Sequence, residues 1–332
     1  MKKYIYCIAS LLACFSCENG DVEHGDYDYQ TVYFSRQTPI RTIVLGDDVF
    51  DRTLDNNHQF EVYVTLGGVE QNKQDRQIGI AVDPTLCSNM KYSTGGDVSP
   101  LPDGYYTLSS NSITIASGDI WGAVRVSLTD DFFNDPKALS LNYVLPLRIT
   151  SSNDQVLTGK DYTLYGLKYI NKYDGAWLSH GTDVIDLNGE TTTVVREAEY
   201  VEQYDIRYLS TLGLHQVSYP LSTTVEVVDA NGKKSIETLA CRLILTFDGQ
   251  DACNITTDTE ECEAEGSGTW ERGGARQAWG GKDRDLLKLN YTVTYHYQTN
   301  GTTAYKKYTS TDELIMRDRQ ANKLEDFTIQ SK

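Results

Sequence analysis

The sequence lacks the patterns that most enzyme classes require. It has no Gly-x-Ser-x-Gly nucleophile elbow and no glycine-rich phosphate loop ahead of a helix, and its five histidines show no His-x-x-x-His spacing. Beyond residue 17 there is no Cys-x-x-Cys pair, which argues against structural zinc. Neighbouring acids such as Asp283 and Asp285 are expected by chance in so acidic a chain, so they do not indicate a glycosidase. We therefore expect no catalytic residues, no metal site and no cofactor.

Positive charge and phenylalanine are also scarce. Lys+Arg 30 against Asp+Glu 47 gives a net charge of -17 at pH 7, which argues against nucleic acid or an anionic membrane surface as a partner. The negative charge does not argue against a neutral ligand. Tyrosine outnumbers phenylalanine by 23 to 8, and its flat apolar face with a hydroxyl suits β-sheets and wet binding surfaces.

No apolar run is long enough to span a membrane. Residues 4–15 are uncharged and mostly apolar, follow Lys2 and Lys3, and fall short of the ~20 residues that a span requires. This pattern indicates an export signal. The run leads into Ser16 and Cys17, and an acidic segment follows. Residues 1–17 therefore match a bacterial lipoprotein signal, which is cleaved before a cysteine that carries the lipid. Cys17 is the expected lipid carrier, and Cys14, preceded by Leu-Leu-Ala, is the alternative.

Four cysteines remain beyond the signal, at positions 87, 241, 253 and 262. An exported chain can oxidise them. Cys253 and Cys262 are close enough in sequence to close a short loop, which would stabilise the fold by roughly 2–3 kcal/mol. The sequence alone does not choose among the three full pairings that four cysteines allow.

Residues 18–30 are acidic, glycine-containing and nearly free of aliphatic side chains, so they predict a flexible tether. After them, residues 59–66 alternate strictly between apolar and polar, as a half-buried strand does. The same period recurs in short segments separated by turn formers, which predicts an immunoglobulin-like β-sandwich over residues 31–165. Residues 131–141 are expected to be irregular or briefly helical. The recurring segments are 78–82, 113–115, 124–128 and 143–149.

Residues 166–332 predict a second all-β domain. Asn231-Gly232 and Asn300-Gly301 each lie between alternating segments, and Asn-Gly is a strong hairpin signal. An antiparallel meander that closes on itself removes exposed strand edges. Near its start, Tyr173-Asp174-Gly175-Ala176-Trp177 is similar to the first strand of lipocalin-like barrels, in which the glycine permits close backbone approach and the tryptophan plugs one barrel end.

Both halves resemble the domains of one lipoprotein class. Residues 29–51, 105–108, 128–130 and 143–149 resemble the N-terminal module of Bacteroidetes surface lipoproteins of polysaccharide-utilisation systems. Residues 171–184 (NKYDGAWLSHGTDV) and 278–291 (AWGGKDRDLLKLNY) resemble the C-terminal domain of the same two-domain proteins. Both domains are of unknown function in that class. The acidic segment after Cys17 also resembles the signal for display on the outer face of the outer membrane.

Tryptophans in the second domain are the candidate ligand platforms. A sugar ring presents C–H bonds on its face and hydroxyls at its rim, so it is bound by flat aromatic rings with polar groups nearby. Trp270 and Trp279 flank residues 271–276, expected to form a polar loop that contains Arg272 and Arg276. Trp177 is the third candidate, and a structural role remains the alternative for all three tryptophans. Tyr291, Tyr295 and Tyr297 share a strand face with aliphatic residues and are expected to be core.

The sequence thus predicts a noncatalytic cell-surface lipoprotein that binds a polysaccharide or oligosaccharide for a neighbouring outer-membrane importer. A structural or adhesive protein that acts through protein contacts is the alternative. An undetected glycosidase ranks third, and it would require two converging acids in a water-filled pocket of the second domain.

Overall fold

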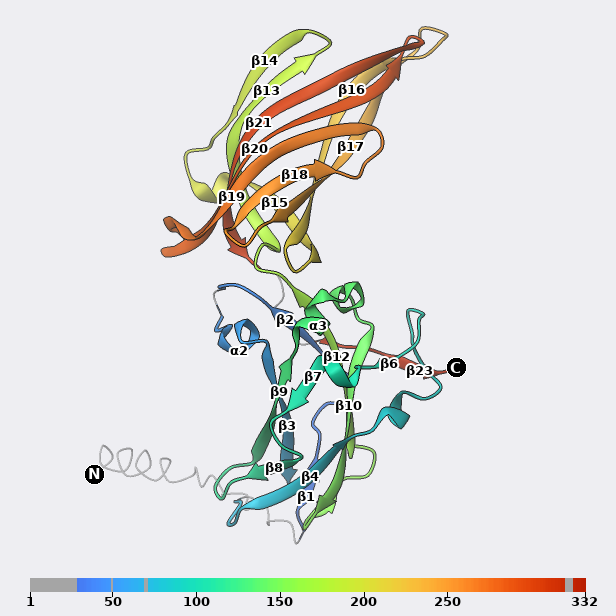
Figure 1. The fold of residues 1–332 in the computed structure, drawn as a ribbon, viewed down its shortest axis with the longest axis vertical. Coiled ribbons are helices and arrows are strands. Elements are labelled where there is room, and N and C mark those ends of the chain that lie inside the picture. The colour runs from blue at the N-terminus through green and yellow to red at the C-terminus, as the bar shows by residue number, and fades with distance from the viewer. Residues whose placement is uncertain (1–28, 49, 69–70, 320–324) are drawn as a thin grey trace, which may run out of the picture.

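The computed structural model describes residues 29–48, 50–68, 71–319 and 325–332, which form two β-sheet domains stacked along the long axis of the molecule (Figure 1). The predicted signal, Cys14, Cys17 and most of the predicted tether lie outside the described residues. No helix in the described ranges is long and apolar enough to cross a membrane.

The N-terminal domain is a sandwich of two main sheets, as predicted. One sheet has the order β11 (Gln155–Val156), β1 (Thr31–Tyr33), β3 (Gln59–Gly67), β9 (Trp121–Leu128), β7 (Tyr106–Leu108). The other has the order β22 (Glu325–Asp326), β2 (Pro39–Val44), β12 (Tyr162–Ile170), β10 (Tyr143–Ser152), β4 (Arg76–Val82), β8 (Ser112–Ile115), with β6 (Ser99–Pro100) beside β10.

Short helical turns connect these strands. α3 (Asp130–Asn134) and η4 (Pro136–Leu139) occupy the segment that was expected to be irregular or briefly helical. The other short helices are α2 (Thr53–Asn56), η2 (Pro84–Cys87), η3 (Asp103–Tyr105) and, in the second domain, η5 (Val201–Gln203).

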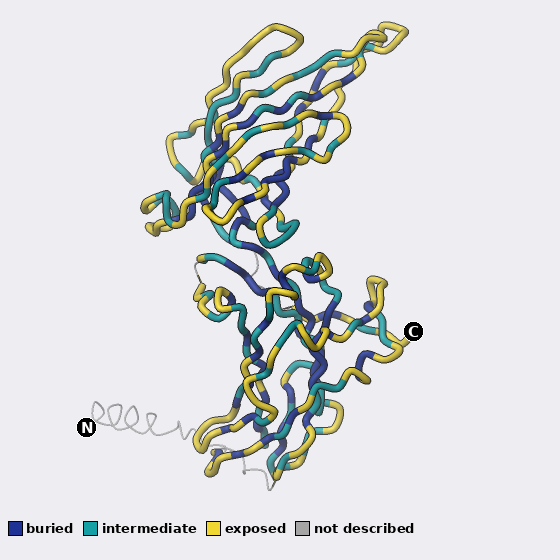
Figure 2. Tube along the Cα trace, in the orientation of Figure 1, coloured by how far each residue is buried: buried dark blue, intermediate teal, exposed yellow. Residues whose placement is uncertain are grey.

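The alternation in the sequence sets which side chains form the sandwich core. On β3, Phe60, Val62 and Val64 are buried between the sheets, whereas Glu61 and Tyr63 point outward. Figure 2 shows the buried residues running through the centre of this domain. The period-two pattern therefore predicts both the strand and its buried face.

The second domain is a curled antiparallel sheet whose ends meet through β13 and β21, in agreement with the predicted lipocalin-like barrel. The Asn-Gly pairs form the predicted turns, and Asn300 and Gly301 have φ angles of 49° and 74°. The strands, in sheet order, are β14 (Glu190–Arg196), β13 (Gly175–Leu187), β15 (Asp205–Gly213), β16 (Gln216–Val228), β17 (Lys234–Phe247), β18 (Ala252–Thr257), β19 (Cys262–Trp279), β20 (Lys282–Thr299) and β21 (Thr302–Asp318).

The barrel is closed near the sandwich and open at its far end. Close to the sandwich, β13 pairs with β15 through residues 175–179, but farther out it pairs with β14 through residues 181–187. β16 pairs with β15 only through residues 216–218, so beyond them it has a partner on one side only among the described strands. Figure 2 accordingly shows many exposed residues at the far end.

Gly175 and Trp177 close the barrel end as the lipocalin resemblance implied. Gly175 has a φ of 143°, and a Cβ there would lie 2.6 Å from the backbone oxygen of Asp318. The Trp177 side chain is fully buried, and its indole N–H donates to the backbone oxygen of Tyr173 at 3.1 Å. Gly175 therefore permits the close backbone approach, and the Trp177 side chain fills the same end of the barrel.

The domain boundary differs from the predicted one at residues 165 and 166. β12, residues 162–170, lies in the sandwich between β2 and β10. The C-terminus also returns to the sandwich, where β22 pairs with β2 and β23 (Ile329–Ser331) pairs with β5 (Met90–Tyr92). Alternation alone does not reveal which sheet a strand joins, so the sequence did not predict that β12 and the C-terminal strands belong to the sandwich.

The expected loop-closing pair Cys253–Cys262 is wrong, because Cys241 and Cys262 form the disulfide and Cys253 is a buried free thiol. The register explains the difference. Cys253 on β18 lies opposite Gly268 on β19. Cys262 lies six residues from Gly268 along β19, roughly 20 Å away at the rise of a strand.

Candidate functional site

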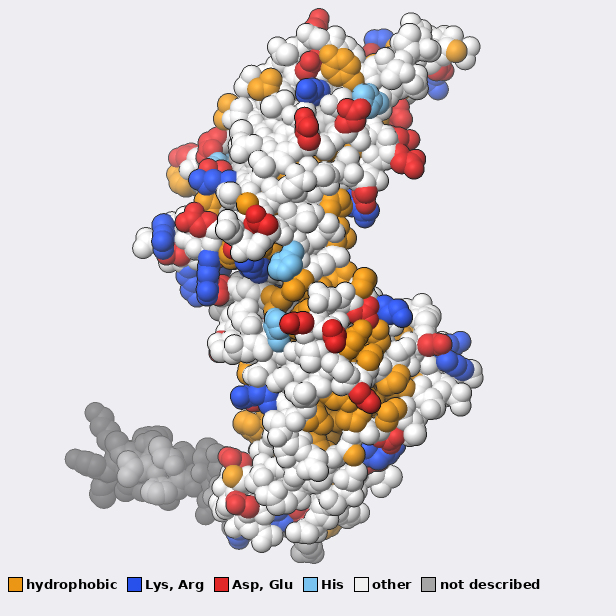
Figure 3. Space-filling view, viewed as in Figure 1, with side chains coloured by type: hydrophobic (Ala, Val, Ile, Leu, Met, Phe, Trp, Pro, Cys, Tyr) orange, Lys and Arg blue, Asp and Glu red, His pale blue; other side chains and the backbone are white. Residues whose placement is uncertain are grey.

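A cleft of about 710 Å³ lies between the two domains. This volume falls within the ~300–1,000 Å³ of typical ligand sites. On the face drawn in Figure 3, histidine side chains lie on both sides of the junction. The sandwich contributes Leu45, Gly46, Asp47, Asn56 and His58, and the barrel contributes Lys172, Leu214, His215, Asp251, Trp270 and Arg272.

Trp270 and a lysine–aspartate pair form the barrel side of the cleft. Lys172 Nζ lies 2.6 Å from Asp251 Oδ1 and 4.1 Å from the centroid of the Trp270 ring. The Tyr173 hydroxyl also donates to Asp251 Oδ1, at 2.7 Å. Partial burial alone would raise the pKa of Asp251, but the hydrogen bonds from Lys172 and Tyr173 lower it below its usual value. The carboxylate is therefore ionised at neutral pH.

Arg272 joins the barrel to the sandwich at the cleft. Its guanidinium makes a bidentate contact with Asp47, with Nη2 2.7 Å from Oδ1. Burial lowers the pKa of His58, so that imidazole is neutral at pH 7. The two cations and two acids pair within the cleft, which consequently presents fixed polar groups but little net charge.

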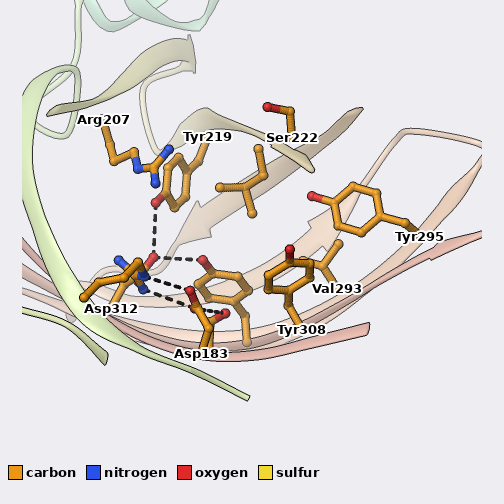
Figure 4. Close-up of a pocket in the computed structure, with 12 residues that line it drawn as sticks. Asp183, Arg207, Tyr219, Ser222, Val293, Tyr295, Tyr308 and Asp312 are labelled. Atoms are coloured by element: carbon orange, nitrogen blue, oxygen red, sulfur yellow. Dashed lines mark hydrogen bonds and ion pairs between the residues drawn. The ribbon is translucent and has the colours of Figure 1, made fainter. Parts of the chain in front are cut away.

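A second cavity, of about 80 Å³, is lined by side chains from β13, β14, β15, β16, β20 and β21 of the barrel (Figure 4). At its side, the buried carboxylate of Asp312 accepts hydrogen bonds from Tyr291 at 2.8 Å and Tyr219 at 3.1 Å. Burial raises the pKa of both phenols, so they remain protonated donors. Arg196 forms an ion pair with the same carboxylate.

Asp183 is the second acid at this cavity. It accepts from Arg196 Nε at 2.8 Å and from the Ser310 hydroxyl at 2.7 Å. Burial would lower the pKa of Arg196, but the hydrogen bonds and charges of Asp183 and Asp312 raise it. Both acids thus share one guanidinium, and the volume is well below that of a typical ligand site. This geometry suits a buried polar network that links β13, β14, β16, β20 and β21.

The structure brings together two of the five predicted ligand residues, Trp270 and Arg272, in the cleft. Trp177 is fully buried, which excludes it as a ligand platform. Trp279 packs on the outside of the barrel beside Leu286 and Ile315, and neither it nor Arg276 lines the cleft. Arg276 instead pairs with Asp283 at 2.6 Å.

Residues 271–276 are not the expected loop, because β19 continues through them, with one shift of register between Glu271 and Ala275 and a second between Ala275 and Trp279. Sequence reasoning also missed Lys172, Asp251 and His215. Lys172 stands inside a segment that carried the family resemblance, but nothing in the sequence places it beside Asp251 or opposite Asp47. The cleft exists only once both domains are assembled.

Comparisons with known proteins match both domains. The profile of a family described as Domain of unknown function (DUF5627) matches residues 172–320, and that of an N-terminal domain family matches residues 27–156. No curated protein matches the chain.

Among solved structures, a Bacteroides ovatus protein of unknown function is 31% identical, with a TM-score of 0.78, and the match covers 93% of this chain and 100% of that one. A second B. ovatus protein of unknown function is 15% identical over 90% of this chain and 99% of its own, with a TM-score of 0.41. A third, provisionally described as carbohydrate-binding, is 14% identical over 91% and 97%, with a TM-score of 0.29, too low to support an argument. On the strength of the first match, the chain belongs to the same two-domain family as that B. ovatus protein of unknown function.

Proposed function

We propose that the protein is a noncatalytic glycan-binding lipoprotein of the cell surface, and that the cleft between its domains holds the glycan. The observation that supports this most directly is the meeting of Trp270 and Arg272 in a cleft of about 710 Å³. In this proposal the chain is anchored in the outer membrane through Cys17 and passes its ligand to a neighbouring importer.

The chemistry of the cleft matches a neutral sugar. Trp270, Leu45 and Leu214 line the cleft with apolar atoms, with Lys172 Nζ over one face of the Trp270 ring, and the paired polar groups offer donors and acceptors for the hydroxyls of a sugar. Since the cations are already paired with acids, a polyanion gains little there, and the net charge of -17 repels it. Micromolar to millimolar affinity, about −8 to −4 kcal/mol, is adequate because display of many copies on a surface adds avidity.

Two arginines on β19 provide a matched test. The soluble form that begins after Cys17 is run through affinity gels that contain a panel of polysaccharides. Trp270→Ala and Arg272→Ala are each expected to weaken retention about tenfold, about 1.4 kcal/mol. Arg276→Ala, on the same strand but outside the cleft, retains binding. Thermal melts establish that each variant is folded.

Three results would contradict the proposal. Retention of the wild type on none of the polysaccharides would favour the adhesive alternative. Equal losses for Arg272→Ala and Arg276→Ala would move the site away from the cleft. Release of reducing sugar from the panel would make the protein a hydrolase, and the Asp183 and Asp312 pair would then become the first residues to substitute.

A further inference from the structure

An exposed aromatic pair lies on the outward face of the sandwich, remote from the three tryptophans of the barrel. The side chains of Trp121 and Tyr63 are 55% and 38% exposed. Their ring centroids are 5.2 Å apart, and the ring planes meet at 72°. The rings stand on neighbouring strands, since Tyr63 on β3 lies opposite Ala123 on β9 and Thr65 lies opposite Trp121. Together the two rings form an exposed, two-sided aromatic surface, the Trp121–Tyr63 corner.

Polar groups beside this corner are held in fixed positions. The Tyr63 hydroxyl donates to Glu61 Oε2 at 2.7 Å, and Arg125 Nη2 lies 2.9 Å from Glu61 Oε1. Hydrogen bonds from Arg125 and then Tyr63 lower the pKa of Glu61, and burial together with Glu61 raises the pKa of Tyr63 to about 12. The acid is therefore ionised, the phenol is protonated, and the Tyr63 ring is oriented before any ligand arrives. Single exposed apolar residues need no explanation, but an organised cluster of this kind does.

The chemistry of the corner selects among possible occupants. Flat aromatic surface with a carboxylate and a guanidinium at its edge matches the face and the hydroxyl rim of a sugar. A second copy of this chain also carries a net charge of -17, so long-range repulsion opposes self-association. The same charge opposes an anionic membrane.

β3 connects the corner to the cleft. Its first residue, Gln59, follows His58, which lines the cleft. The outward-facing positions then continue through Glu61 and Tyr63 to Thr65, opposite Trp121. The seven residue steps from His58 to Thr65 span roughly 23 Å. A glycan of several sugar residues has the length to contact both ends of this strand.

We propose that Trp121 and Tyr63 form a second carbohydrate contact, which binds the portion of a long neutral glycan that extends beyond the interdomain cleft. The inference rests on the proposed function of the cleft and deepens it. The protein then binds a polymer more tightly than a short oligosaccharide of the same sugar.

Ile120 supplies a matched control for Trp121, because it is the adjacent residue and is 54% exposed. The assay uses the polysaccharide that the wild type binds and a short oligosaccharide made from it. Trp121→Ala and Tyr63→Ala are expected to weaken polymer binding about fivefold to tenfold and to leave oligosaccharide binding unchanged. Ile120→Ala changes neither, and Trp270→Ala weakens both.

The outcomes separate the two proposals. If Trp121→Ala binds polymer like the wild type while Trp270→Ala does not, the second contact is wrong and the cleft proposal stands. If Trp121→Ala loses polymer binding and Trp270→Ala keeps it, the corner is a glycan site and the cleft is not. Sedimentation that shows a wild-type dimer abolished by Trp121→Ala, with polymer binding intact, would make this face a protein contact and overturn the inference. Absence of wild-type binding to any glycan would overturn both.

Discussion

Asp312 is the residue on which the polar interior of the barrel depends. Its side chain is 1% exposed. The carboxylate accepts hydrogen bonds from two phenol hydroxyls and forms an ion pair with one guanidinium inside the barrel. The sequence predicted Tyr291 as core, correctly. It did not single out Asp312, because an acid on an alternating strand ordinarily marks the solvent face, and only the assembled barrel supplies its donors.

Asp312→Ala is expected to destabilise the fold by about 3 kcal/mol. Loss of one partner of a buried ion pair costs roughly 3–5 kcal/mol, and the lower end applies because Asp183 still pairs with Arg196. The two phenols meanwhile lose their acceptor. Urea unfolding followed by tryptophan fluorescence gives the change in the free energy of unfolding.

The exposed pair of Arg242 and Asp258 is the control for this measurement, since its side chains are 51% and 47% exposed. Asp258→Ala is expected to leave the free energy of unfolding nearly unchanged, because exposed ion pairs contribute little to stability. Equal losses for Asp258→Ala and Asp312→Ala would mean that the buried network contributes little to stability.

Strand alternation predicted the elements well but not their partners. The segment 59–66 gave β3 and its buried face, and Asn300-Gly301 gave a hairpin turn at the right place. Trp270 emerged as a candidate because tryptophan beside a polar segment is unusual, although that segment proved to be strand. Cysteine pairing failed because it depends on register, which period-two alternation leaves undetermined over long hairpins.

The disulfide and the free thiols can be distinguished by alkylation of the form that begins after Cys17. In denaturant without reductant, Cys87 and Cys253 are expected to react, and Cys241 and Cys262 only after reduction. In the native protein at pH 8 both free thiols should be inert, because burial raises the pKa of Cys87 to about 11 and of Cys253 to about 12 and the thiolate is the reactive form. Peptide mapping by mass spectrometry identifies each site.

Matched serine variants complete the alkylation test. Cys253→Ser leaves the disulfide intact, whereas Cys241→Ser adds one reactive thiol, at Cys262, and removes about 3 kcal/mol of stability from a loop of 21 residues. A peptide that links Cys253 to Cys262, or rapid native labelling of Cys253, would contradict the pairing in the structure.

At the scale of the molecule, the two domains share more chain than a simple linker would provide. The C-terminal residues return to the sandwich, where Phe327 is buried and packs against Tyr92 with ring centroids 5.4 Å apart. The sequence predicted two β-domains in order, but this return is a nonlocal pairing of very short strands. The domains are consequently tied by both ends of the barrel.

Arg319, which follows the last barrel strand, connects the barrel to the sandwich. It is 1% exposed, and its guanidinium donates to Asp285 at 2.9 Å, to the backbone oxygen of Asp174 at 3.0 Å and to that of Asp47, in the sandwich, at 3.1 Å. Gly46 makes room for it, because a Cβ there would lie 2.7 Å from Arg319 Nη2. One buried side chain therefore joins the barrel to the loop after β2.

Arg319→Met is expected to destabilise the protein by about 3–5 kcal/mol at neutral pH, because it leaves the Asp285 carboxylate buried and unpaired. It should also separate unfolding into two calorimetric transitions, since the domains lose a shared interaction. Arg272→Ala is the matched control: it also contacts Asp47, but its side chain is 71% exposed, so a loss below ~1 kcal/mol is expected.

The pH dependence identifies the cause of the Arg319 effect. Burial raises the pKa of Asp285 even with Arg319 present, and removal of the guanidinium raises it further. A carboxyl whose folded-state pKa exceeds its unfolded value stabilises the fold fully below the unfolded pKa, and this contribution is lost as pH rises through the folded pKa. The deficit of Arg319→Met in urea unfolding should therefore be smaller at pH 5 than at pH 7.5. A stability deficit that does not change with pH would attribute the loss to packing at the junction and not to the unpaired acid. A single calorimetric transition would show that the returning C-terminal strands suffice to couple the two domains.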